Sequence, residues 1–488
     1  MTRPNILLIM TDQQRADSLG CYGADWLETP NLDGLAAAGT RFTSCTVNNP
    51  ICTPSRASIM TGKELPGHGV YRLHDRLPNE EVLFPERLRS EAGYRTALFG
   101  KLHVSGRVVE EAERHPNDGF EDYEWCLESC VGMDSRFNGY VAWLRENDPA
   151  FLADLRKRMR GVKHHPEEVH FTHWAATRTI DYIRERAQRN EPFFCMMSIF
   201  DPHNPYEDYP LTVADKVHRE RIPAPIAGGR LPEAARRERD GSYLGADFSD
   251  DFIRDMRFGY GASIAFADKE IGKVLATLEE CGIAENTLVI FMSDHGDQLG
   301  DHGMMVKGVA LYEPTVNVPL IMRWPGHVAA GETSPFLAQG HDIARTCLAA
   351  AGLDPARDGT FDTGHDLVSA AKGGATRNVA VCAYRNSGIN RENAYWDPPM
   401  KATCVRSADA KLIAYTSGDD VEYEYFDLAA DPREEASRID DPAAAPKVNA
   451  LFRELGGWLQ REAGLAGSRG GGWFPSSDSF MQNAVEKR

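Results

Sequence analysis

The sequence predicts an α/β protein in which a large mixed, mostly parallel sheet is covered by helices on both faces. A smaller antiparallel sheet with one helix is expected at the C-terminal end. Short runs rich in Ile, Val, Leu and Phe predict strands that are buried on both faces. Amphipathic helical patterns separate these runs, as in layered α/β folds. After residue 378, strand-like runs follow one another across turn residues, which is typical of antiparallel sheets.

The expected elements follow in chain order. Strands of the large sheet, all taken as parallel, are expected at residues 5–11, 95–99, 193–199, 287–293 and 319–323. The principal helices among them are expected at residues 30–38, 175–189 and 255–281. The small sheet is expected at residues 379–384, 402–406, 411–415 and 422–427, and its helix at residues 445–463.

This pattern divides the chain into three parts. Residues 1–378 would form the catalytic domain, residues 379–466 a C-terminal subdomain, and residues 467–488 a tail without periodicity. The tail is expected to act as an arm between subunits of a homo-oligomer. Two long polar insertions, called the roof below, lie at about 130–173 and 205–251, and insertions of this size often cover an active site. Aromatic side chains in and beside the roof would stack on a planar alcohol or pack the insertions together.

Composition excludes several classes of protein. Hydrophobic residues make up 42% and charged residues 26% of the 488 residues, which is ordinary for a globular chain. With 54 Lys and Arg against 72 Asp and Glu, the net charge is −18, so no nucleic-acid or anionic-membrane partner is expected. The apolar run near the N-terminus is too short for a signal peptide, and no run reaches the roughly 20 apolar residues of a membrane span. We therefore expect a cytoplasmic protein.

Polar residues follow four of the predicted strands: Asp12 and Gln13, Lys101 and His103, Asp201 and His203, and Asp294 and His295. Ligand sites of open α/β sheets lie at the carboxyl ends of strands, so these side chains are expected to meet in one crevice. Oxygen-rich coordination with one nitrogen suits Ca²⁺, Mg²⁺ or Mn²⁺ better than Zn²⁺. The alternative is structural: the Asp after the fourth strand would cap a turn, and the His beside it would pack in the core.

A second cluster surrounds Cys52. Pro54 suits the first turn of a helix, so Cys52 is expected just before a helix N-terminus, with Arg56 one turn further on. The positive end of the helix dipole favours an anionic nucleophile or a bound anion there. On these grounds Cys52 is a candidate reactive cysteine, and the alternative is an inert buried thiol.

Residues 52–62 read C-T-P-S-R-A-S-I-M-T-G and resemble the signature of the sulfatase family, C-x-P-S-R-x-x-x-x-T-G. Other blocks resemble the family in the same order, at residues 29–33, 93–103, 293–308 and 425–432. The resemblance extends over most of the chain. It implies a formylglycine-dependent arylsulfatase of the alkaline phosphatase superfamily, related to phosphonate monoester hydrolases.

In that family a maturation enzyme, either oxygen-dependent or anaerobic, converts the signature cysteine into formylglycine, so the resemblance implies this modification of Cys52. The formylglycine hydrate would attack a small sulfate ester and form a covalent sulfo-enzyme intermediate. The resemblance also implies one divalent cation, with Ca²⁺ favoured over Mn²⁺ or Mg²⁺. Its ligands would be Asp12, Gln13, Cys52, Asp294 and His295.

The resemblance further assigns catalytic roles. Arg56, Lys101 and Lys307 would stabilise the charge on the group in transfer. His203 would protonate the leaving oxygen, and His103 would take the proton whose loss releases sulfate.

Some positions depart from the family pattern. Many relatives have Asp at the position of Gln13, and the Asp12-Gln13 pair of this chain is similar to the pattern of the phosphonate monoester hydrolase branch. Met60 and Lys63 replace the commoner Leu and Arg of the maturation signal. Lys101 and His103 keep the sulfatase pair.

Two rival functions remain open at this point. A phosphonate monoester or phosphodiester hydrolase would use the same site, because sulfuryl and phosphoryl groups share geometry and charge placement. A non-enzymatic metal- or anion-binding protein would keep Cys52 as a thiol. The mass of the peptide that contains Cys52 distinguishes this second rival from an enzyme.

Overall fold

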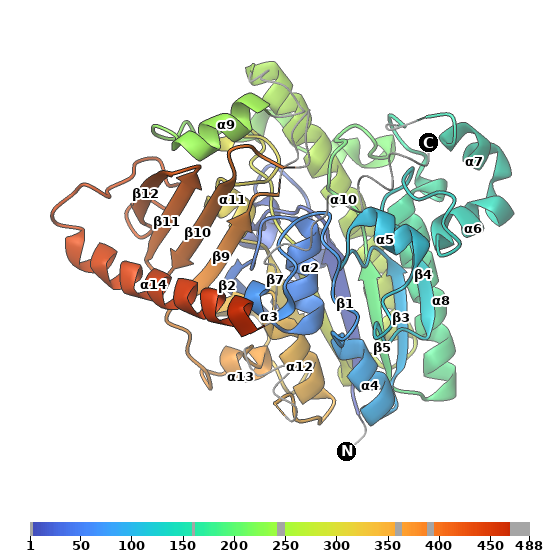
Figure 1. Ribbon diagram of the computed structural model, residues 1–488. Helices are drawn as coiled ribbons and strands as arrows, with labels where there is room; N and C mark the ends of the chain where they lie inside the picture. Colours follow the sequence, from blue (N-terminus) through green and yellow to red (C-terminus); the bar gives the residue numbers. More distant parts are fainter. Residues whose placement is uncertain (1–2, 159–161, 242–248, 357–363, 388–394, 469–488) are drawn as a thin grey trace.

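The computed structural model describes residues 3–158, 162–241, 249–356, 364–387 and 395–468 of the chain (Figure 1). Its large sheet has eight strands in the order β4-β3-β5-β1-β6-β7-β2-β8. The strands are β1 Asn5–Thr11, β2 Thr40–Thr46, β3 Arg95–Gly100, β4 Asp122–Trp125, β5 Phe193–Ser198, β6 Thr287–Ser293, β7 Leu320–Arg323 and β8 Glu332–Gln339. The four central strands β3, β5, β1 and β6 are mutually parallel, which confirms the predicted fold class.

The expectation that residues 319–323 form a parallel strand is wrong. β7 pairs antiparallel with both β6 and β2. Only the four-residue helix α11 (Glu313–Val316) and the 3-10 turn Asp301–Gly303 interrupt the chain between β6 and β7. Without a long crossover helix the chain turns back at the same edge of the sheet, and this connection produces an antiparallel pair.

Three strands were missed because they carry the polar residues typical of sheet margins. β4 and β8 are the two edge strands, and β8 contains Pro335, which an edge strand tolerates. β2 reads T-R-F-T-S-C-T and mixes Thr and Ser with few apolar residues. None of the three has the continuous apolar run that identified the central strands.

Helices cover both faces of the sheet. On β1, Ile6 and Leu8 pack into one core, and Leu7 and Ile9 pack into the other. The first core includes α2 Cys52–Thr61, α4 Phe84–Ala92 and α12 Asp342–Ala350, and the second includes α1 Pro30–Ala37, α8 Phe171–Arg189 and α10 Asp250–Glu280. The shorter helices are α3 Leu65–His68, α5 Arg107–Ala112, α6 Gly139–Asn147, α7 Pro149–Leu155, α9 Glu233–Gly241 and α13 Leu367–Ala371. Among the described helices, none is long and apolar enough to cross a membrane.

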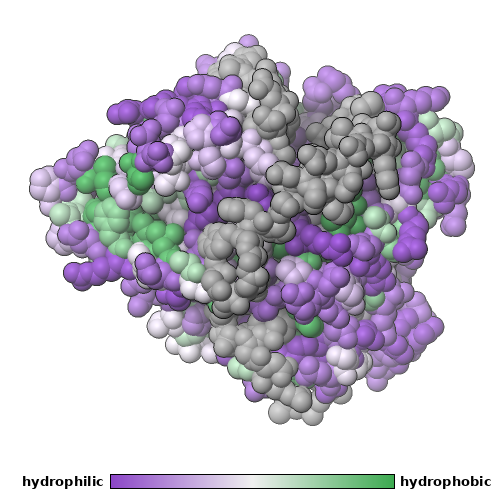
Figure 2. Space-filling view, viewed as in Figure 1, coloured by the Kyte–Doolittle hydropathy of each residue, from purple (hydrophilic) through white to green (hydrophobic). Residues whose placement is uncertain are grey.

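The second sheet is antiparallel and lies beside the large one, with α14 along it (Figure 1). Its order is β12-β11-β10-β9, and its elements are β9 Ala380–Arg385, β10 Met400–Arg406, β11 Ala410–Ser417, β12 Asp420–Asp427 and α14 Ala445–Ser468. Val421 and Tyr423 of the edge strand β12 are exposed, and apolar side chains gather over this sheet in Figure 2. The proposed tail lies almost entirely outside the described residues.

Candidate active site

The four central strands bring the predicted polar residues together. β3, β5, β1 and β6 are neighbours and point the same way, so the residues that follow them meet at one edge of the sheet. Asp12, Gln13, Asp294 and His295 have no exposed surface, and Lys101 is 2% exposed. The crevice expected from the sequence is therefore a buried polar cluster.

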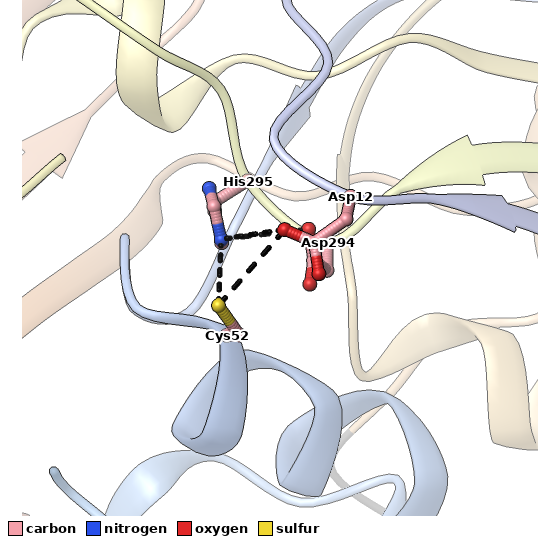
Figure 3. A group of neighbouring side chains, drawn as sticks. All are labelled: Asp12, Cys52, Asp294 and His295. Atoms are coloured by element: carbon pink, nitrogen blue, oxygen red, sulfur yellow. Dashed lines mark hydrogen bonds and ion pairs between the residues drawn. The ribbon is translucent and has the colours of Figure 1, made fainter. Parts of the chain in front are cut away.

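Four side chains at this edge can hold a metal ion (Figure 3). Asp12, Cys52, Asp294 and His295 each offer one donor atom, and these atoms lie within 4.8 Å of one another. The Sγ atom of Cys52 is 3.2 Å from Nε2 of His295 and 4.0 Å from Oδ1 of Asp12. These four residues all belong to the metal site predicted from the sequence.

Cations surround the two carboxylates. Arg56 Nε lies 2.6 Å from Oδ2 of Asp294, and its Nη2 lies 3.3 Å from Oδ2 of Asp12. Lys101 Nζ lies 2.5 Å from the same Asp12 oxygen. Burial and the neighbouring Cys52 oppose ionisation of Asp12, but Lys101, His203 and Lys307 hold the pKa of Asp12 far below its usual value. Asp12 is therefore present as a carboxylate at any physiological pH.

The thiol of Cys52 lies in an electropositive environment. Cys52 is the first residue of α2, so the helix begins at the cysteine itself and not after it as expected. Burial opposes the thiolate, but Lys101, Lys307 and His295 outweigh burial and hold the pKa of the thiol well below its ordinary value. The position of this side chain thus stabilises an anion.

Lys307 and Gln13 complete the cluster. The Lys307 ammonium lies 2.8 Å from Oε1 of Gln13, 3.1 Å from Sγ of Cys52 and 3.0 Å from Nε2 of both His203 and His295. An ammonium has three protons, fewer than the four acceptor atoms around it. The four acceptor atoms around Lys307 could therefore make more bonds to a cation than a lysine can satisfy. The oxygen and nitrogen atoms among them suit a divalent ion.

The two predicted catalytic histidines contact different groups of the site. His203 Nδ1 is 2.7 Å from the carbonyl oxygen of Asn204 and donates to it, so Nε2 faces Lys307 as an acceptor. His103 Nε2 is 3.1 Å from Oγ1 of Thr53. Burial and the charge of Lys101 lower the pKa of His103 to about 3, so its imidazole is neutral.

Two of these residues have left-handed backbones. The φ angles are 68° at Gln13 and 57° at His103, values that L-residues other than glycine rarely adopt. The Gln13 amide N–H is held by Oδ1 of Asp294, and the His103 amide N–H is held by Oε2 of Glu110. Both turns aim the side chain back towards the site.

Several residues that support the site were not predicted from the sequence. Glu110 holds the His103 loop, Thr53 contacts His103, and Ser198 accepts from Nη1 of Arg56. Asp297 and Tyr206 surround the Gln13 amide. Thr53 and Asp297 stood in motifs that resemble the family, and the others have ordinary sequence neighbours that reveal no such contact.

Some aromatic side chains in and beside the roof pack in the core, and one reaches the site. Tyr140, Phe171 and Trp174 pack against one another in the core, with ring centroids 5.5 to 5.8 Å apart. For these three rings the structure favours the packing alternative. Tyr206 does reach the site, and Tyr243 lies outside the described residues.

Comparison with known proteins identifies the family of the chain that carries this site. The family model described as Sulfatase matches residues 4–353, which is more than half of the chain. The chain belongs to the sulfatase family. A second model, described as N-sulphoglucosamine sulphohydrolase, C-terminal, matches residues 300–460 of this sulfatase.

Individual relatives agree. An arylsulfatase of Clostridium perfringens is 28% identical to this sulfatase over 475 residues, which are 93% of this chain and 94% of the relative. An N-acetylgalactosamine-6-sulfatase of Rattus norvegicus is 30% identical over 412 residues, 79% of this chain and 69% of the relative. The chain is accordingly a sulfuric ester hydrolase.

A solved structure shows the same fold. Phosphonate monoester hydrolase SpPMH from Silicibacter pomeroyi superposes with a TM-score of 0.76 at 23% identity, over 94% of this chain and 96% of that chain. The architecture of this sulfatase is therefore shared across both branches of the resemblance. Fold alone does not choose between sulfate and phosphonate esters.

Proposed function

We propose that this sulfatase hydrolyses aryl sulfate monoesters with a formylglycine hydrate made from Cys52. The environment of Cys52 carries the proposal. Cys52 is the first residue of α2, and its Sγ atom is 3.1 Å from the Lys307 ammonium. The positive groups that favour a thiolate here would equally favour an anionic oxygen on the modified side chain. The modification itself is a two-electron oxidation with loss of the sulfur, performed by a separate maturation enzyme.

The neighbouring residues would then divide the chemistry between them. One oxygen of the hydrate, ionised beside the positive groups of the site, attacks sulfur while the S–O bond to the alcohol breaks, and the imidazolium form of His203 gives its proton to the leaving oxygen. The second hydroxyl then gives its proton to His103, the C–O bond to the sulfo group breaks, and its electron pair leaves with sulfate. The aldehyde is restored. A serine ester has no second hydroxyl and could not release sulfate in this way.

The charged groups of the site fit a transferred sulfuryl group. Arg56 is fixed by two carboxylates, whereas Lys101 and Lys307 converge on the side chain of residue 52. We propose one divalent cation, Ca²⁺ in preference to Mn²⁺ or Mg²⁺, on the ligands Asp12, Gln13, Asp294, His295 and the modified Cys52. Such an ion would supply positive charge that stabilises the transition state.

A phosphonate monoester or phosphodiester hydrolase is the second candidate. Gln13 favours it, because Asp12 followed by Gln13 is similar to the pattern of the phosphonate monoester hydrolase branch. We expect hydrolysis of such esters as a secondary activity at the same site.

The decisive measurement is the mass of the tryptic peptide that contains Cys52. We expect replacement of CH₂–SH by an aldehyde, and Cys52→Ala should abolish turnover of an aryl sulfate while the fold is retained. Cys21→Ala, which alters a thiol outside the site, is the matched control. An intact thiol in fully active protein contradicts the mechanism.

Substrate choice is tested with matched leaving groups. The kcat/KM values for an aryl sulfate, aryl phosphonate, aryl phosphodiester and alkyl sulfate should be highest for the aryl sulfate. A tenfold preference for a phosphonate or diester, about 1.4 kcal/mol in barrier, would replace the first candidate by the second.

A further inference from the structure

The side-chain amide of Gln13 is held from both ends. Its Nε2 lies 2.6 Å from Oδ2 of Asp297, 3.4 Å from Oδ1 of Asn204 and 3.5 Å from the hydroxyl of Tyr206. Its Oε1 lies 2.8 Å from the Lys307 ammonium. The NH₂ end thus meets three acceptor atoms, and the carbonyl end meets a positive charge.

Asp297 is the strongest of these contacts. It has no exposed surface, and Oδ2 accepts from both Nε2 of Gln13 and the hydroxyl of Tyr206, each at 2.6 Å. Its Oδ1 accepts from the backbone N–H of Leu299 at 3.0 Å. Both oxygens are therefore occupied as acceptors, and a carboxylate is the side chain of this shape whose two ends both accept.

The orientation of the amide decides what Gln13 can do. A glutamine has one end that can coordinate a cation, Oε1, and one end that cannot, the NH₂ group. The Asp297 carboxylate favours the orientation that turns Oε1 towards the cation, because it accepts from the NH₂ group and would repel Oε1 in the opposite orientation.

We infer that Asp297 is a positioning residue that makes Gln13 an oxygen ligand by holding its NH₂ group. This inference rests on the proposed cation site. It also explains how an amide replaces the second Asp found in many relatives: the negative charge missing at residue 13 is present at residue 297, behind the ligand. Tyr206 ties this pair to the second insertion of the roof.

The inference predicts that Gln13 and Asp297 depend on each other. Gln13→Asp would place a second carboxylate against Asp297, where two like charges repel. Asp297→Asn would leave one oxygen to serve both Leu299 and the Gln13–Tyr206 pair, so the Gln13 amide would lose its fixed orientation. In the double variant Gln13→Asp/Asp297→Asn, the amide of residue 297 can donate to the new carboxylate and restore the pair.

The experiment measures Ca²⁺ binding by calorimetry on the full chain after chelator treatment. Asp297→Asn and Gln13→Asp should each weaken Ca²⁺ binding at least tenfold. The double variant should bind at least tenfold more tightly than either single variant. Tyr206→Phe should weaken binding by a smaller factor, and Tyr209→Phe, in the same insertion but outside this hydrogen-bonded group, should have no effect. Circular dichroism checks that each variant is folded.

The outcomes separate this inference from the proposed function. If the wild-type protein binds no Ca²⁺ or Mn²⁺, the proposed cation site is wrong. If the wild type binds but Asp297→Asn binds equally well, or if Gln13→Asp alone binds as tightly as the double variant, only the role of Asp297 is overturned. The Cys52 peptide mass, measured on the same samples, reports on the mechanism independently.

Discussion

The guanidinium of Arg56 contacts four groups of the active site at once. Besides the two carboxylates, its Nη1 donates to the carbonyl of Lys101 and to Oγ of Ser198, each at 2.9 Å. A lysine has the charge but not the planar fork, so it cannot make these bonds together. Arg56→Lys should lower kcat by about 100-fold or more.

The same substitution should lower stability in a way that a cation repairs. Asp12 and Asp294 would repel each other once the fork is lost, and a bound divalent ion would screen that repulsion. The melting temperature of Arg56→Lys should therefore rise more with added Ca²⁺ than that of the wild type. An equal rise in both proteins would show that Arg56 does not separate the two carboxylates.

Glu110 holds the His103 turn through four donors. Its Oε2 accepts from the His103 N–H and the Trp125 indole, and its Oε1 accepts from the N–H groups of Val104 and Ser105. Glu110→Gln would turn an NH₂ group against two of these buried donors. We expect a loss of about 2–4 kcal/mol in the free energy of unfolding, measured in urea. Glu111→Gln, next in sequence and paired with Arg107 near the surface, should change little.

Residues that follow strands could be predicted because strand direction fixes where they go. Asp12, Lys101, His203 and Asp294 come together through the order of the sheet alone. Glu110 and Tyr206 could not be predicted in the same way. Each reaches the site through a side chain from a helix or insertion, and no period in the sequence encodes that contact.

Among the helices, α9 links the roof to the catalytic loop. Both carboxylate oxygens of Glu238 accept from the Val309 N–H, at 2.9 and 2.8 Å, two residues beyond Lys307. Gly308 permits this approach, since a Cβ atom there would collide with the Glu238 carboxylate. Arg237 on the same helix donates to the carbonyl groups of Asp397 and Pro398. The position of Lys307 thus depends on a helix that the sequence placed only in a polar insertion.

Burial raises the pKa of Glu238 to about 8, from an ordinary value of 4.5. The folded state therefore binds this proton more tightly than the unfolded state, and the resulting stabilisation is present below pH 4.5 and lost as the pH rises through 8. Glu238→Gln mimics the protonated form at every pH. Relative to the wild type, the variant should gain stability between pH 5 and pH 8.5, as measured by urea unfolding. Asp240→Asn, on the exposed side of α9, is the control, and a constant difference across this range contradicts the prediction.

The long central elements were predictable at this scale, whereas marginal elements were not. β1 and β6 match their predicted bounds because seven buried residues in succession leave no alternative period. The direction of β7 depends on how the preceding loop returns, which is a property of the loop and not of the strand. For the edge strands, solvent exposure makes the sequence polar and removes the signal.

Across the whole molecule, buried ion pairs join the small sheet to the active site. Lys411 on β11 has no exposed surface and lies 2.8 Å from Glu434 and 3.1 Å from Glu313. Glu313 begins α11, whose next two residues accept hydrogen bonds from the N–H groups of Asp297 and Gly296. The two sheets should therefore unfold together.

Lys411→Met tests this linkage, because it removes the cation beside the buried Glu434 and leaves Glu313 paired with Arg406 alone. We expect a loss of about 3–5 kcal/mol in the free energy of unfolding. Loss of activity and loss of circular dichroism should follow one urea transition. Lys447→Met, which breaks a half-exposed pair with Asp409, should cost at most about 1 kcal/mol. Separate transitions for activity and secondary structure would show that the sheets are independent.

The complete enclosure of α2 sets an order of events in biosynthesis. All ten residues of this helix are buried, and Cys52 is 2% exposed. A maturation enzyme that must grip the segment and reach its thiol has no access once α2 has docked on the sheet. Conversion of Cys52, as proposed above, would then compete with folding of the nascent chain. The converted fraction would depend on how much maturation enzyme is present while each molecule is being made. Chains that fold before conversion would keep Cys52 as a thiol permanently.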